Sequence, residues 1–172
     1  MMQYTLAFDS PQAHANNPLA QRRALVQMFN RATSQAKRRR FLARLTGRLT
    51  QLQTLQLQGM RAGGQIPGVE IVSLDEIVGS EGRSHDFDNH FWPLHEDNRD
   101  RWVNIAQVMS SKKGLPPVQL IHTDAGYFVR DGHHRISVAR ALGQAAIEAE
   151  VISYRNSSMG IQWIGKTVMR ET

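Results

Sequence analysis

The chain has 172 residues, enough for one globular domain with an appendage but not for two full domains. Apolar residues make up 41% and charged residues 21%, which supports a packed core and excludes wholesale disorder. Cysteine is absent, which excludes a disulfide framework, a thiolate zinc site and a cysteine nucleophile. The sequence predicts neither a membrane span nor a signal peptide, so we expect a cytoplasmic location.

Positive charge is concentrated in the N-terminal third of the chain. Residues 1–61 hold ten Lys and Arg against one acid, Asp9, whereas residues 62–172 hold eleven against fourteen acids. The first segment therefore carries a net charge of +9 and the second a net charge of −3. This asymmetry predicts a basic arm that faces a polyanion, attached to a nearly neutral body.

Helical spacing dominates the first part of the chain. Residues 1–18 have no clear period, whereas residues 19–58 contain one Gly, no Pro and apolar residues at helical spacing. We expect one long helix or two shorter helices there. A strand within residues 45–58 is the alternative, because that stretch alternates in part. Residues 61–68 are rich in Gly and are interpreted as a linker.

Short strands and helices alternate after this linker. The predicted strands lie at 69–72, 118–121, 127–129 and 147–152. Helices are predicted at 99–113 and 134–142, with Gly114 and Gly143 at their C-terminal caps. Residues 73–78 are expected to form a turn or a helical turn, and residues 79–97 a loop. The body is therefore expected to be α+β, that is, mixed α/β.

The segment YFVRDGHHRISVARALG, at 127–143, is the one that suggests chemistry. A strand enters a tight turn at Asp131 and Gly132, and a helix begins at once with His133, His134 and Arg135. The first turn of a helix offers N–H groups and a positive dipole end, and Gly lets the backbone approach a ligand closely. The pattern is typical of a phosphate or carboxylate cradle. Surface histidines behind an Asp131 N-cap are the alternative.

Three blocks in this order resemble the ParB/sulfiredoxin superfamily, which also includes proteins labelled ParB-like nucleases. GSEGRSHDFD at 79–88 resembles the segment in which an Arg precedes a Phe-Asp pair, and GLPPV at 114–118 resembles a helix-to-strand step. Residues 127–143 resemble the phosphate-binding box of ParB. The resemblance covers 69–152, about half of the chain. It implies a small sheet with flanking helices, in a single-domain relative.

The resemblance implies nucleotide binding, with Mg²⁺ and a nucleoside triphosphate, ATP or CTP, as expected ligands. His133 and His134 are the candidate catalytic residues, and His133 is expected to be the more exposed. Asp86 or Asp88 would hold the metal. Phe87, between them, is expected to anchor its loop in the core. The residues that would face the phosphates are Arg83, Asp131, Gly132, His133, His134 and Arg135.

Departures from the family pattern narrow the function. Sulfiredoxins carry a catalytic Cys where this chain has His133, so sulfinic acid reduction by that route is excluded. ParB clamps carry an E-N-x-x-R segment where this chain reads SYRNSSMG, and few residues remain for a helix-turn-helix domain. We therefore expect a basic helical extension over 1–65, a ParB/sulfiredoxin-like domain over 66–155 and a tail over 156–172.

The densest basic run is KRRRFLARLTGR, at 37–48. Arg and Lys side chains on one helix are suited to salt-sensitive contacts with nucleic-acid phosphates. Three alternatives stay open: a solvated face that pairs with acidic loops of the body, a helix on an anionic membrane surface, and self-association into a homodimer. The expected contacts with DNA are Lys37, Arg38, Arg39, Arg40, Arg44 and Arg48.

The expected function is Mg-dependent nucleotide binding, with DNA contact through the basic helices. If the ligand is turned over, the expected classes are phosphoryl transfer, NTP hydrolysis by an NTPase, or DNA nuclease activity. Two alternatives stay open. One is a non-enzymatic DNA-binding or regulatory module, and the other is a small-molecule kinase of the free-serine-kinase type.

Overall fold

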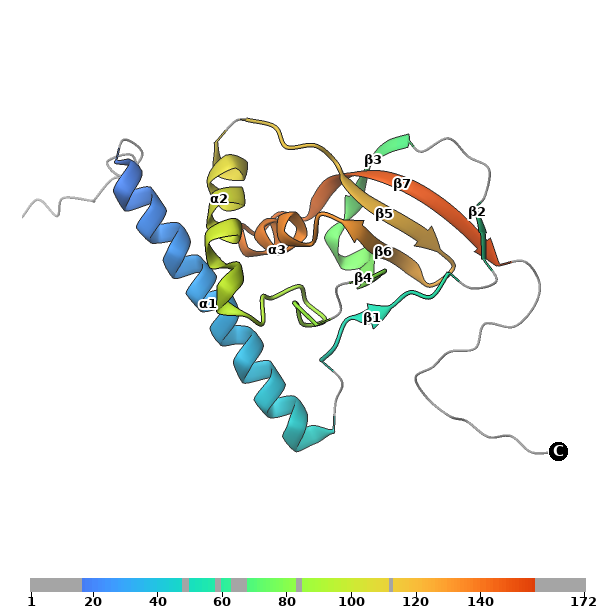
Figure 1. The fold of residues 1–172 in the computed structure, drawn as a ribbon, viewed down its shortest axis with the longest axis horizontal. Helices are drawn as coiled ribbons and strands as arrows, with labels where there is room; N and C mark the ends of the chain where they lie inside the picture. The colour runs from blue at the N-terminus through green and yellow to red at the C-terminus, as the bar shows by residue number, and fades with distance from the viewer. Residues whose placement is uncertain are drawn as a thin grey trace, which may run out of the picture.

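The computed structural model describes residues 17–47, 50–57, 60–62, 68–82, 85–111 and 113–156. Over these ranges a mixed sheet lies beside α3, α3 contacts α2, and α1 packs along α2 (Figure 1). The predicted α+β class is confirmed. Within the same ranges, no helix combines the length and the apolar character that crossing a membrane requires.

Seven strands make up the sheet in the described part of the chain. Their order is β1-β4-β6-β5-β7-β2, and β3 also pairs with β7. The pairs β1–β4, β4–β6 and β5–β7 are parallel, and the other pairs are antiparallel. The strands are β1 (Gln53–Thr54), β2 (Met60–Ala62), β3 (Gly68–Ser73), β4 (Ile77–Ser80), β5 (Val118–Thr123), β6 (Gly126–Asp131) and β7 (Ala146–Asn156).

Local capping signals set the ends of the three α-helices, which are α1 (Pro18–Thr46), α2 (Arg99–Ser110) and α3 (His133–Ala141). The side chain of Asn17 accepts hydrogen bonds from the N–H groups of Leu19 and Ala20, which starts α1. At the end of α3, the Gly143 N–H donates to Arg140 and the Gln144 N–H donates to Ala139. This pair of bonds forms a Schellman motif and confirms the predicted role of Gly143, which has a φ of +72°.

The structure corrects several predicted boundaries. Residues 19–58 hold both a helix, α1, and a strand, β1, so each of the two interpretations is right for part of the segment. The turn predicted over 73–78 covers a 3-10 turn at Leu74–Glu76, but the prediction missed β4. Helix α2 ends at Ser110 and its cap is Ser111, so the predicted cap at Gly114 is wrong. The interpreted linker at 61–68 includes part of β2 and the start of β3.

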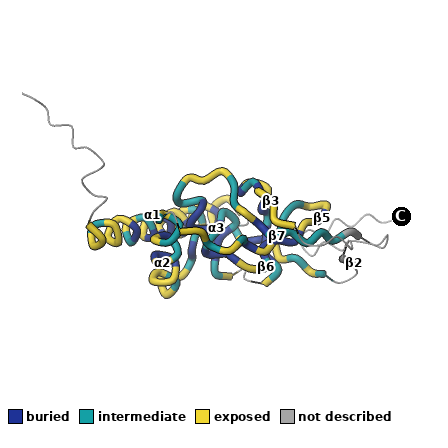
Figure 2. Tube along the Cα trace, turned by 90° about the horizontal axis from the view of Figure 1, so that it is seen from above, coloured by how far each residue is buried: buried dark blue, intermediate teal, exposed yellow. Residues whose placement is uncertain are grey.

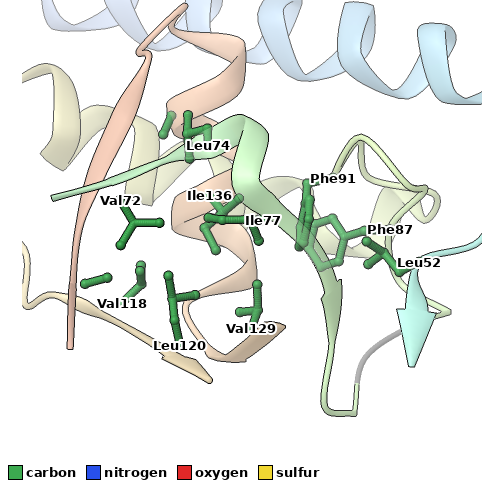
Figure 3. Packing of buried hydrophobic residues seen from close by; sticks show 12 residues of the cluster. Leu52, Val72, Leu74, Ile77, Phe87, Phe91, Val118, Leu120, Val129 and Ile136 are labelled. Carbon is green, nitrogen blue, oxygen red and sulfur yellow. The ribbon is translucent and has the colours of Figure 1, made fainter. Parts of the chain in front are cut away.

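Buried apolar side chains form two clusters. The first lies between the sheet and α3, where Ile136 packs against Val118, Leu120 and Val129 (Figure 3). The same cluster extends to Leu52, Phe87 and Phe91 under the loop that follows β4, as Figure 3 also shows. The members of the second cluster come from all three helices: Leu25, Phe29, Trp102, Val103, Ala106 and Val138.

Helix α1 is attached to the body through this second cluster. The Phe29 ring contacts the Trp102 ring edge-on, with centroids 5.6 Å apart, and the Trp102 Nε1 donates to Ser137 Oγ at 2.9 Å. Figure 2 shows exposed residues along much of α1 and buried residues around α3. The N-terminal half of α1 is therefore a packed element of the fold, whereas the second half contributes few buried side chains.

Replacing Phe29 with Ala is expected to lower the free energy of unfolding by about 3–5 kcal/mol, because the side chain is 1% exposed and leaves a cavity. The matched control is Phe41→Ala on the same helix, where the ring is 63% exposed. That control is expected to change stability by less than about 0.5 kcal/mol. Urea denaturation measures both, and equal losses would show that α1 is not held through Phe29.

Candidate anion-binding site

The turn from β6 into α3 packs directly against β5. Gly132 is the N-cap residue of α3 and has a φ of +102°, which non-glycine residues rarely adopt. A Cβ placed on Gly132 would lie 2.5 Å from Val118 Cγ1 and 2.8 Å from Val118 Cβ. Since Val118 is itself buried, neither partner has room to move. The sequence must therefore provide Gly at this position to bring α3 against the sheet.

The side chain of Arg135 holds this turn in place. Its Nη2 donates to Asp131 Oδ2 at 2.7 Å, and its Nη1 donates to the carbonyl oxygens of Pro117, at 2.9 Å, and of Pro116. The guanidinium thus joins the first turn of α3 to the segment that enters β5. Asp131 acts as the partner of Arg135 at i, i+4 rather than as the N-cap of the helix.

A small pocket of about 80 Å³ lies at the start of α3. It is lined by the turn residues Asp131, Gly132, His133, His134 and Arg135, together with Arg101 and Ile105 of α2. Five of the six residues predicted to face phosphate therefore line one pocket. The sixth, Arg83, lies outside the described residues.

Arg101 and Ile105 line the pocket but were not predicted from the sequence, and Arg101 is the charged one. It is exposed and lies four residues before Ile105 on the same helix, so both face the start of α3. The sequence signal that could have indicated Arg101 is its position directly before Trp102, which is buried against the body. It brings a second guanidinium to the positive end of the α3 dipole.

The two predicted catalytic histidines are buried beneath Phe87. His133 is 5% exposed and His134 is 4% exposed, so the expectation that His133 is exposed is wrong. The Phe87 ring stacks on His133 with centroids 6.1 Å apart and meets His134 edge-on at 5.2 Å. Phe87 is fully buried, which confirms its predicted role as the anchor of its loop.

Ser80 provides a polar contact for His133 inside the body. The distance between Ser80 Oγ and His133 Nε2 is 2.7 Å, and Ser80 Oγ also accepts from the Gly82 N–H at 3.1 Å. Ser80 ends β4, so this contact ties the start of α3 to the strand that pairs directly with β6. Both side chains are buried, which indicates that the His133 ring supports the backbone of the turn from inside the body.

Asp88, one of the two predicted metal ligands, is committed to its own loop. Its Oδ1 accepts from the N–H groups of His90 and Trp92, both at 2.9 Å, and its Oδ2 lies 3.6 Å from Arg39 Nε. Burial raises the pKa of Asp88, and the hydrogen bonds from Trp92 and His90 and the charge of Arg39 oppose that rise. This carboxylate organises the loop and docks it on α1, which fits a metal ligand poorly.

Asp86 is the other predicted metal ligand. It directly precedes Phe87 in the sequence and is half-buried. Within the described residues, no group of three His, Asp or Glu side chains converges as a metal cluster would require. Mg²⁺ in nucleotide sites commonly takes one or two carboxylates and completes its shell with phosphate oxygens and water. Asp86 alone therefore stays a predicted ligand for Mg²⁺ that arrives with a nucleotide.

Part of the basic run on α1 pairs with carboxylates of the body. Lys37 Nζ donates to Glu96 Oε1 at 3.0 Å, and this hydrogen bond lowers the pKa of Glu96. Arg39 pairs with Asp88, as described above. The remaining described members of the run, Arg38, Arg40 and Arg44, are exposed, and Arg48 lies outside the described residues.

Comparisons with known proteins provide little further information. No protein-family model matches the chain, and no curated protein matches it. A solved structure described as sulfiredoxin from Arabidopsis thaliana matches with 16% sequence identity and a TM-score of 0.41. That match covers 52% of this chain and 89% of the sulfiredoxin chain.

Replacing Gly132 with Ala is expected to lower the free energy of unfolding by about 3 kcal/mol or more, because the positive φ and the contact with Val118 both oppose a Cβ. Gly143→Ala is the matched control. Its φ is also positive, at +72°, but a Cβ there meets nothing within 4 Å, so the expected loss is about 1 kcal/mol. Chemical denaturation measures both losses. Equal values would show that the contact with Val118 is unimportant.

The buried carboxyl of Asp88 predicts a pH dependence of stability. Because its pKa is raised in the folded state, its contribution is fully present below the unfolded value near 3.8 and is lost as the pH rises through the folded pKa. The free energy of unfolding of the wild type, relative to Asp88→Asn, is therefore expected to fall as pH rises above about 4. Urea denaturation across this range tests the sign, and a relative stability that rises with pH would contradict it.

Proposed function

We propose that this chain binds a phosphorylated small molecule, a nucleotide, at the turn between β6 and α3. The observation that carries the proposal is the pocket at the start of α3, where Arg101 and Arg135 meet the helix N-terminus. Backbone N–H groups and the positive dipole end favour an anion there, and guanidinium groups are suited to phosphate oxygens. The resemblance of residues 127–143 to the ParB phosphate-binding box supports the same ligand.

The pocket is of a size for a phosphate group rather than for a whole nucleotide. A second, larger groove of about 320 Å³ adjoins it at Arg135 and is lined by apolar residues that include Met109, Leu115 and Pro116. We propose that the phosphates enter the small pocket and that the nucleoside lies toward this groove. An apolar wall beside a charged anchor is the usual composition of a ligand site.

Binding is the part of the function that the described geometry supports best. The His133 and His134 rings are buried against Phe87, so their proposed role is to support the backbone that cradles the phosphate. Turnover by phosphoryl transfer, NTP hydrolysis or nuclease action stays a prediction, as does a free-serine-kinase type of activity. Asp86 is the residue we propose beside a nucleotide-bound Mg²⁺.

Contact with DNA through α1 is a weaker proposal. Two of the five described basic residues of the run, Lys37 and Arg39, are paired with Glu96 and Asp88. Three arginines, Arg38, Arg40 and Arg44, are exposed for phosphate contacts. A non-enzymatic DNA-binding module would bind DNA with a strong salt dependence and without any effect of changes at the α3 turn.

Titration calorimetry and thermal shift with ATP, ADP, CTP, GTP and inorganic phosphate, each with and without Mg²⁺, test the nucleotide site. At least one nucleotide is expected to raise the melting temperature of the wild type, because a ligand that binds the folded state stabilises it. Arg101→Ala is expected to weaken that binding about tenfold, since it removes a charged hydrogen-bond donor.

Arg99→Ala provides the matched control, because Arg99 is exposed on the same helix but does not line the pocket. It is expected to bind the nucleotide as the wild type does. Arg101 is a better test position than Arg135, whose loss would also release the turn from Pro117 and Asp131. Equal binding by the wild type and Arg101→Ala, or no binding to any nucleotide, would overturn the proposed function.

A further inference from the structure

The C-terminal part of α1 carries an apolar patch on the side that faces away from the body. Phe41, Leu42 and Leu45 are 63%, 58% and 70% exposed, respectively. At about 100° per residue they lie opposite the buried Ala36 and Ala43 of the same helix. We call these three residues, with the exposed Arg38 and Arg44 beside them, the α1 patch.

The sheet carries a second apolar patch of opposite charge. Val69 and Ile71 of β3 are 65% and 71% exposed, and their direct partners across the β3–β7 pair are Glu150 and Glu148. Residues directly opposite each other in an antiparallel pair lie on the same face of the sheet. The side chains of Val69, Ile71, Glu148 and Glu150 therefore lie together. We call these four residues the β3 patch. Val72, the next residue of β3, lies on the opposite face of the sheet and is buried.

Charge decides which surfaces can pair. Two copies of the α1 patch would bring arginines against arginines, and two copies of the β3 patch would bring glutamates against glutamates, so both symmetric contacts are disfavoured. An α1 patch against a β3 patch joins apolar to apolar and basic to acidic. The two patches lie at distant places on one chain, at the lower end of α1 and at the upper edge of the sheet in Figure 1. They cannot meet within one molecule.

We propose that the α1 patch binds the β3 patch of a second copy of this chain, so that the protein associates head to tail. A nucleic acid fits the α1 patch less well, because it would cover the arginines but provide little apolar surface for Phe41, Leu42 and Leu45. A contact between two different surfaces leaves one of each kind open on a dimer. The assembly therefore grows further, into a ring if the rotation closes and into a filament if it does not.

Sedimentation velocity of the full chain over a range of concentrations tests the proposal. The wild type is expected to form species larger than a dimer as concentration rises, and these species are expected to shrink in high salt. Leu45→Glu inactivates the α1 patch by facing the glutamates, and the double variant Val69→Ser with Ile71→Ser inactivates the β3 patch. Each variant alone is expected to be a monomer.

The mixture of the two variants gives the decisive result. Each keeps the surface that the other has lost, so an equal mixture is expected to form dimers and nothing larger. Leu19→Glu is the matched control, because Leu19 is as exposed as Leu45, at 70%, but lies at the opposite end of α1. It is expected to assemble as the wild type does. Circular dichroism and melting temperature check that every variant is folded.

Three results would overturn the proposal: a wild type that stays monomeric, a single-patch variant that still assembles, or a variant mixture that stays monomeric. A monomeric wild type whose binding to duplex DNA is lost in Arg38→Glu would assign the α1 patch to nucleic acid instead. Ile71 and Glu148 of the β3 patch also line the larger groove proposed for the nucleoside, but the nucleotide measurements vary Arg101 of the small pocket, which belongs to neither patch. Failure of one proposal is therefore distinguishable from failure of the other.

Discussion

The structure depends on the close approach of the Gly132 backbone to Val118. This contact sets how near α3 lies to the sheet, and it leaves the first turn of the helix open toward α2. Arg135 reinforces it from one side through Asp131 and the carbonyls of Pro116 and Pro117. On the other side, His133 contacts Ser80 and lies beneath Phe87. The proposed phosphate site is thus formed by the same contacts that anchor α3, and we expect few of these contacts to change when a ligand binds.

Charged residues have two different roles in this protein: some hold the fold together, and others stay exposed at the surface. Asp88 and Arg39 come from segments that are far apart in sequence, and their pairing fastens the loop after β4 to α1. Arg101, by contrast, is exposed beside the start of α3. The difference follows from burial: a carboxylate removed from water must find donors, whereas an arginine at the rim keeps its hydration. Only the second kind of residue is available to a ligand.

The sequence predicted most of what local physics determines. Gly143 and the helix before it, the β5–β6 hairpin and the turn at Asp131–Arg135 all follow from period and turn chemistry. The sequence did not predict β4, because its pairing with β1 and β6 is non-local. Arg101 was missed for the same reason: its place in the pocket depends on how α2 packs against α3. The burial of His133 also depends on Phe87, which lies in a distant loop.

The placement of β7 has a consequence for how the chain is made. It is the last strand in sequence of the described part, yet it pairs with β5 on one edge and with β3 and β2 on the other. During synthesis, the edges of β5 and β3 therefore stay unpaired until β7 leaves the ribosome. Val69 and Ile71 belong to β3, one of the two strands whose edge stays unpaired until then. Until β7 pairs with them, these open edges can pair with strands of a neighbouring chain.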